Sequence, residues 1–300
     1  MYGAVMGLAG LALTGRAAAT VWPGVVRAPA YLTEPWVLLG AIALLLLLAT
    51  YFLKGFRSVK ADFTNPMTMG FCGALPVGMS LVAGGIGPYA PAFAVALWWL
   101  AFALFTAFQV WALARLLSGG FAIGDVNPGW LIILVGGIVL PGPGVSLGLA
   151  EASRFSFGIS ATVAPILMAL LFYRAIAGPA LPDALRPTWF ILLVPPSLIY
   201  ANGLTLYPET IVLENLLYFS LALAAALLAI SRSFLRWPFG PPWWAFTFPL
   251  DALAYAAARY AQDHPTPLWR GVCAATLLLA ALVVLLVLWR TLRSAASRQG

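Results

Sequence analysis

Charged residues are scarce in this sequence of 300 residues, and their scarcity decides its class. Asp, Glu, Lys and Arg make up 8% of the chain, whereas hydrophobic residues make up 63% and the mean hydropathy is +0.97. A soluble globular protein of this length needs more polar surface than that. The composition therefore excludes a soluble protein and indicates a chain that crosses a membrane several times.

Cysteine and histidine are also nearly absent. The two cysteines, Cys72 and Cys273, lie far apart in separate apolar runs, which predicts neither a disulfide framework nor a metal site. The one histidine, His264, follows Asp263 in a loop, where exposure to solvent is the usual state. No nucleophile, base and orienting acid come together in the sequence, so we expect no enzymatic activity, no metal and no cofactor.

Ten apolar segments follow one another along the chain, each close to the ~20 residues that a helix needs to cross a bilayer. Short connections rich in glycine and proline separate several of them, as at residues 84–88 and 178–182. No segment suggests a separate soluble domain, so we expect one transmembrane domain over residues 1–300. The predicted spans are residues 2–21, 36–56, 65–85, 89–114, 129–149, 153–175, 187–206, 211–231, 241–260 and 268–290.

Basic residues outnumber acidic ones, 16 to 9, but they are scattered at the ends of the predicted spans. This pattern argues against a nucleic-acid partner, which requires a clustered basic surface. Most basic residues fall on the side that holds both termini, so the positive-inside rule predicts a multi-pass protein of the cell inner (plasma) membrane with cytoplasmic termini. The residues on this side are Lys54, Arg57, Lys60, Arg115, Arg174, Arg186, Arg232, Arg236, Arg290, Arg293 and Arg298; those on the other side are Arg16, Arg27, Arg154, Arg259 and Arg270.

Proline divides the spans into two kinds. The third, fifth, seventh and ninth spans carry prolines well inside the run, at Pro76, Pro141, Pro195 and Pro249, whereas the even spans lack central prolines except for Pro165. A proline inside a helix removes a hydrogen-bond donor, and in a membrane such a break is tolerated mainly where it faces protein or water. The regular spacing indicates a repeated helical hairpin. We therefore predict an all-α membrane protein with five hairpins around a central pore, odd helices inside and even helices outside.

The ninth span, residues 241–260, contains the residues that we expect to control this pore. Phe248 immediately precedes Pro249, so an inner position would point its ring at the enclosed space. Asp251 is the one ionisable residue near the middle of an odd span, and the lack of acidic rings argues against a path for cations. Helix ends at the proline breaks can offer partial positive charge to an anion. We therefore expect small inorganic or carboxylate anions as substrates.

Several motifs resemble one family of membrane proteins. The motifs are WWAFTFP at residues 243–249, RPTWFILLVPPS at residues 186–197 and PGWLIILVG at residues 128–136, with further matches at residues 7–11 and 62–66. They are similar to the helix signatures of the tellurite-resistance/dicarboxylate transporter family, which includes bacterial TehA and the slow-type anion channels of plant guard cells. The resemblance covers nearly the whole chain. It implies ten helices in five hairpins, a homotrimer with one pore per subunit, and conduction of anions such as chloride and nitrate past a phenylalanine gate that falls on Phe248.

Two questions stay open at this point. Asp251 stands where this family is expected to have a small or neutral residue, and it is either hydrogen-bonded to a neighbouring helix, protonated, or a site that makes this pore unusual. The second question is the class of transport. The alternative to a passive anion channel is a proton-coupled secondary transporter of dicarboxylate or tellurite oxyanions, with Asp251 as the proton site.

Overall fold

The computed structural model describes residues 2–23, 29–54, 56–208, 213–231 and 236–297. These residues form helices and connecting loops, with no β-strand among them, which confirms the all-α prediction. Within this part of the chain, six helical stretches are long and apolar enough to cross a membrane, so the protein is a multi-span membrane protein. Three of the basic residues used for the predicted orientation, Arg27, Arg232 and Arg298, lie outside the described residues.

The helices follow the predicted spans closely, although many of the spans begin or end a few residues away from their predicted limits. The α-helices are α1 (Gly3–Ala19), α2 (Pro29–Lys54), α3 (Phe56–Thr64), α4 (Ala74–Ile86), α5 (Pro91–Leu117), α6 (Trp130–Val135), α7 (Pro141–Ser146), α8 (Ala150–Ala177), α9 (Val194–Leu206), α10 (Glu214–Ile230), α11 (Thr247–Asp263) and α12 (Pro267–Ala296). The 3₁₀ segments that precede or join them are η1 (Met69–Gly73), η2 (Gly136–Ile138), η3 (Asp183–Leu193) and η6 (Pro241–Phe246). The short helix α3 lies between two predicted spans.

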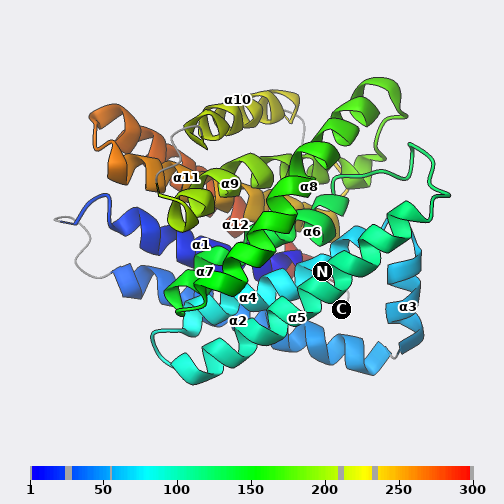
Figure 1. Ribbon diagram of the computed structural model, residues 1–300, viewed down its shortest axis with the longest axis horizontal. Coiled ribbons are helices and arrows are strands. Elements are labelled where there is room, and N and C mark those ends of the chain that lie inside the picture. The colour runs from blue at the N-terminus through cyan, green and yellow to red at the C-terminus, as the bar shows by residue number, and fades with distance from the viewer. Residues whose placement is uncertain (1, 24–28, 55, 209–212, 232–235, 298–300) are drawn as a thin grey trace.

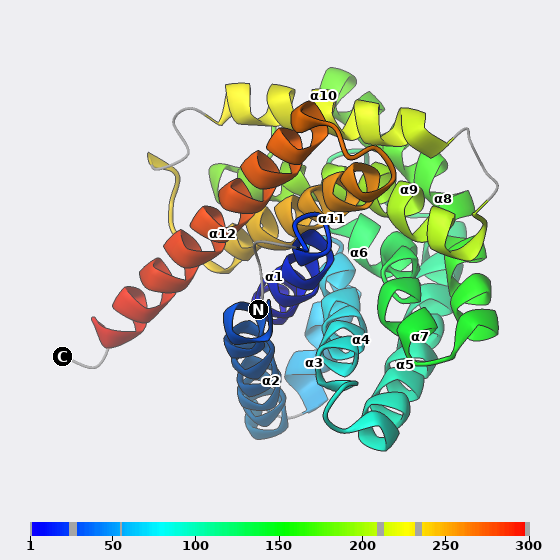
Figure 2. The ribbon, with the colours of Figure 1, turned by 90° about the vertical axis from the view of Figure 1, so that its left-hand side faces the viewer.

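The helices that expose large apolar side chains occupy the periphery, and the mostly buried helices occupy the interior. α10 lies along one edge of the molecule and α2 along the opposite edge (Figure 1). Figure 2 shows α5, α8 and α12 also on the outside, with α1, α4 and α11 nearer the middle. The outer helices expose large apolar side chains, whereas most residues of α1, α4, α9 and α11 are buried. Lipid tails can solvate an apolar surface, so this arrangement satisfies both groups of helices.

The prolines interrupt the inner spans in a different way from the one predicted. Pro76, Pro195 and Pro249 each lie in the first turn of an α-helix that follows a 3₁₀ segment, and Pro141 is the first residue of α7. They are therefore helix starts rather than kinks in the middle of a continuous α-helix. The physical reason is that the first N–H groups of a helix have no intrahelical acceptor, so a proline there loses no hydrogen bond.

The longest interruption, between α6 and α7, frees backbone carbonyl groups inside the membrane. Such groups need donors, because no water is available in the hydrocarbon region. Side chains of neighbouring helices supply them: Gln109 Nε2 donates to Leu134 O (2.7 Å), Ser156 Oγ to Gly137 O (3.2 Å) and Asn202 Nδ2 to Ile138 O (2.7 Å). Trp98 Nε1 adds a bond to Leu140 O (3.1 Å), which also accepts from the N–H of Gly144 (2.9 Å). α5, α8 and α9 thus hold the interrupted span in place.

Glycines allow α1 to approach the η6–α11 segment closely. A Cβ atom at Gly7 would lie 2.1 Å from Oγ1 of Thr247, and one at Gly10 would lie 2.9 Å from Cδ2 of Phe248. At Gly3 the corresponding distance to Cβ of Trp244 is 3.2 Å. Small residues at this spacing are a common means of bringing membrane helices together. The glycines therefore set the position of α11, and with it the positions of Phe248 and Asp251.

Candidate functional site

Two cavities lie among the inner helices. Cavity A has a volume of about 460 Å³ and is lined at the starts of α1, α4, α9 and α11, by Gly3, Ala74, Pro195 and Pro249 among others. Cavity B has a volume of about 550 Å³, and its lining includes Arg16, Gly142, Asn202 and Asp251. Both volumes exceed the space needed for a small anion with some of its water.

Phe248 and Val139 line both cavities, so these two side chains lie where cavity A and cavity B meet. Only 5% of Phe248 is exposed. Its ring lies against Gly10 of α1, where any side chain would collide with it. Phe246, two residues earlier, faces away from both cavities and packs its ring against Phe190 and Trp243. The ring of Phe248 is therefore one of the two side chains that separate the cavities.

The N-terminal ends of several helices meet at cavity A. The first turns of α1, α4, α9 and α11 all contribute lining residues. The N-terminal end of a helix carries roughly half a positive charge from its aligned peptide dipoles. The cavity can therefore attract an anion without a cationic side chain in its lining.

Asp251 lies in the first turns of α11 and lines cavity B beside Phe248. Its side chain is 1% exposed, and neither carboxyl oxygen has a hydrogen-bond partner among the described residues. The hydroxyl of Thr14 donates to the main-chain oxygen of Asp251 instead (3.1 Å). The residue beside the carboxyl group is Gly10, which has no side chain to donate, and the role of Asp251 stays a prediction.

The four prolines predicted to line the pore divide into two pairs. Pro195 and Pro249 line cavity A, whereas Pro76 and Pro141 are buried and line neither cavity. Among the described residues, no group of three or more His, Cys, Asp or Glu side chains is placed to hold a metal ion.

Two lining residues were not singled out from the sequence. Asn202 lines cavity B, and its Oδ1 is buried without a partner while its Nδ2 donates to Ile138. A polar amide inside an inner span is the signal that points to it. Arg16 also lines cavity B. From the sequence, Arg16 indicates only the orientation of the chain, because a basic residue near a span end is usually an interfacial anchor.

Comparisons with known proteins connect this site to a family. A family model described as a voltage-dependent anion channel (SLAC1) matches residues 1–292. The chain is 26% identical to the S-type anion channel SLAH3 of Arabidopsis thaliana over 97% of this chain and 47% of the relative. It is 24% identical to the guard cell S-type anion channel SLAC1 of the same plant, over 87% of this chain and 50% of the relative. The chain thus spans about half the length of these relatives.

A third relative is an uncharacterized transporter, MJ0576, of Methanocaldococcus jannaschii. It is 28% identical over 48% of this chain and 47% of that protein. The match of the family model over nearly the whole chain confirms the resemblance that the motifs indicated. The cavities, the helix starts and Phe248 therefore lie within a chain that belongs to the family of SLAC1-type voltage-dependent anion channels.

Proposed function

We propose that this protein is an anion-selective channel that conducts small anions such as chloride and nitrate through a narrow pore in each subunit. The observation that carries the proposal is the pair of cavities that meet at Phe248. In this proposal cavities A and B are the two vestibules of the pore, and the Phe248 ring is the gate between them. The names of the plant relatives, which are anion channels, support the same function.

The charges around the cavities favour anions over cations. Helix N-termini face cavity A, and cavity B contains a guanidinium group. Asp62 lines cavity A and Asp251 lines cavity B, but no ring of acidic side chains surrounds either cavity in the described part of the chain. Weak and distributed attraction suits conduction, because a conducted ion must leave as readily as it enters.

The assembly that we propose follows the predicted topology. The spans form five hairpins in one domain over residues 1–300, with the odd helices around the pore and the even helices toward lipid. Both termini lie in the cytoplasm and the protein resides in the plasma membrane. Three subunits associate, each with its own pore, and exposed apolar residues of the outer helices such as Leu45 and Leu282 provide surface for lipid or for neighbouring subunits.

The test of the gate is the substitution Phe248→Ala, with anion current recorded in planar bilayers or oocytes. Removing the ring joins the two cavities, so we expect the current to rise roughly tenfold or more, equivalent to lowering a barrier by at least about 1.4 kcal/mol. Phe246→Ala is the matched control, because it removes a buried ring from the same segment that lines neither cavity. An unchanged current in Phe248→Ala, with the protein present in the membrane, would remove Phe248 from the gate.

A second candidate function is a proton-coupled carrier of dicarboxylate or tellurite oxyanions. One observation favours it: the Asp251 carboxyl group is buried beside the gate without a hydrogen-bond partner, and a carboxyl group in such a place can alternate between two protonation states. The carrier predicts uptake that is driven by a pH gradient and abolished by Asp251→Asn. A channel instead predicts a reversal potential that follows the Nernst potential of chloride or nitrate, with Asp251→Asn still conducting.

A further inference from the structure

Arg16 occupies a distinctive place in the last turn of α1. Its guanidinium donates from Nη2 to Gly85 O (3.0 Å) and from Nη1 to Gly84 O (3.4 Å), both near the end of α4. The C-terminal end of a helix carries partial negative charge, so α4 holds the cation in place. The residues that line cavity B around Arg16 include the exposed Pro88 and Ser146, and Arg16 therefore stands at the mouth of cavity B.

Arg16 forms no direct ion pair among the described residues. The hydroxyl of Tyr89 donates to the carboxylate of Glu34; this hydrogen bond raises the pKa of Tyr89, and the nearby Arg16 lowers it. Asp251 lines the same cavity, and both its carboxyl oxygens are buried. The guanidinium is thus not paired directly with a carboxylate, and its five N–H groups exceed the two that donate to Gly84 O and Gly85 O.

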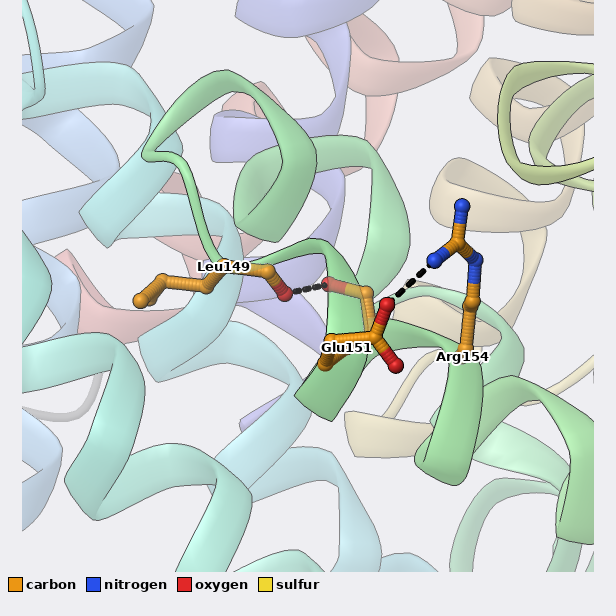
Figure 3. Close-up of polar contacts among 4 residues, drawn as sticks. Leu149, Glu151 and Arg154 are labelled. Atoms are coloured by element: carbon orange, nitrogen blue, oxygen red, sulfur yellow. Dashed lines mark hydrogen bonds and ion pairs between the residues drawn. The ribbon is translucent and has the colours of Figure 1, made fainter.

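Other charged side chains differ from Arg16 in their partners and positions. Arg154, at the start of α8, pairs with Glu151 and lines neither cavity (Figure 3). Within the described residues, Arg16 is the one arginine or lysine that lines either cavity. Cavity A contains Asp62 instead, whose carboxylate accepts a hydrogen bond from Tyr51 (2.9 Å). The lining of cavity A thus includes a carboxylate and no cationic side chain, whereas the lining of cavity B includes the guanidinium of Arg16.

We propose that Arg16 forms an anion-binding vestibule at the mouth of cavity B, and that it concentrates small inorganic anions before they reach Phe248. This inference rests on the proposed channel function and adds a preferred direction of anion current to it. Anions entering from the Arg16 side meet a fixed positive charge, whereas those entering from the Asp62 side meet a negative one. Current carried by anions that enter past Arg16 is therefore larger than current in the opposite direction.

The expected magnitude follows from Coulomb attraction in a wet vestibule. A unit charge about 5 Å from the path of an anion raises the local anion concentration about fourfold in water-like surroundings. We therefore expect Arg16→Gln to lower current carried by anions entering from the Arg16 side about two- to fivefold. The loss is larger at about 0.01 M salt, where charges act over about 30 Å, than at about 1 M, where they act over about 3 Å.

The experiment records chloride current in excised patches, in both directions, for the full-length protein and for the Phe248→Ala variant. Arg16→Lys keeps the charge and retains the directional difference, whereas Arg16→Gln loses it. Arg270→Gln is the matched control, because Arg270 is exposed and lines neither cavity although the sequence predicts it on the same side of the membrane. An equal loss of current in both directions, or no loss, would overturn the inference.

A chemical variant separates charge from folding. In Arg16→Cys with Cys72→Ser, which removes the thiol that lines cavity A, a thiol reagent that carries trimethylammonium restores the current and one that carries sulfonate lowers it further. If both reagents have the same effect, charge at this position has no role. Absence of anion current from the native protein and from Phe248→Ala, with both present in the membrane, is a different result: it refutes the proposed function and the vestibule with it.

Discussion

α11 and α12 are neighbours in the chain and in space, but they are built in opposite ways. α12 is the most apolar of the stretches that can cross a membrane, yet only 22% of the residues in its most apolar part are buried. α11 contains Asp251 and two tyrosines and is not among those stretches, yet most of its residues are buried. In a soluble protein the more apolar helix would be the more buried one. Here lipid tails are the solvent, so the most apolar helix lies outside and the interior is held by close packing and polar contacts.

The largest effect on stability is expected at Gly7, where α1 meets α11. In Gly7→Ala the new methyl group would lie 2.1 Å from Oγ1 of Thr247, and that hydroxyl is fixed by its hydrogen bond to Trp244 O (2.8 Å). We expect a loss of about 3 kcal/mol in the free energy of unfolding, at the upper end of overpacking effects. Thermal unfolding in lipid nanodiscs measures it as a fall in Tm.

Gly158 supplies the control for Gly7 on an outer helix. It lies exposed on α8, and a Cβ atom there would have no atom within 4 Å. Gly158→Ala is expected to leave the stability unchanged or to raise it by up to about 1 kcal/mol through helix propensity. Equal effects of the two substitutions would show that the close approach of α1 to α11 is unimportant for stability.

The sequence alone was sufficient for the class, the family and the positions of most helices. Composition predicted the membrane, and the prolines at positions 76, 195 and 249 marked helices that are buried in the structure. The form of the interruptions was not predictable, because a proline can end, kink or begin a helix and the choice depends on which donors lie nearby. The positions of Arg16 and Asn202 in the lining of cavity B were not predictable either, because they depend on how the helices pack.

A smaller effect is expected at Gln109, which brings an outer helix into contact with the interior. Its Nε2 donates to Leu134 O (2.7 Å) and to Ser160 Oγ (2.9 Å). Gln109→Leu keeps the volume but leaves the freed carbonyl group without this donor, which costs about 2 kcal/mol for a buried polar group. Thr162→Val is the control, since the exposed Thr162 donates only within its own helix, to Gly158 O (2.8 Å). A Tm for Gln109→Leu as high as that of the control would mean that the interrupted span needs no donor from α5.

The smallest effect on stability is expected within α12, between its buried and its exposed side. Val284 is 0% exposed, whereas Leu282 is 56% exposed on the same helix. Val284→Ala removes packed methyl groups and is expected to cost about 1 kcal/mol, because a void inside the protein forfeits its contacts. Leu282→Ala is expected to cost almost nothing in nanodiscs, since lipid tails refill the space and are as apolar as leucine. Leu282→Ala could instead lower Tm as much as Val284→Ala and also dissociate an oligomer on size-exclusion chromatography. That result would mean that this side of α12 contacts another subunit rather than lipid.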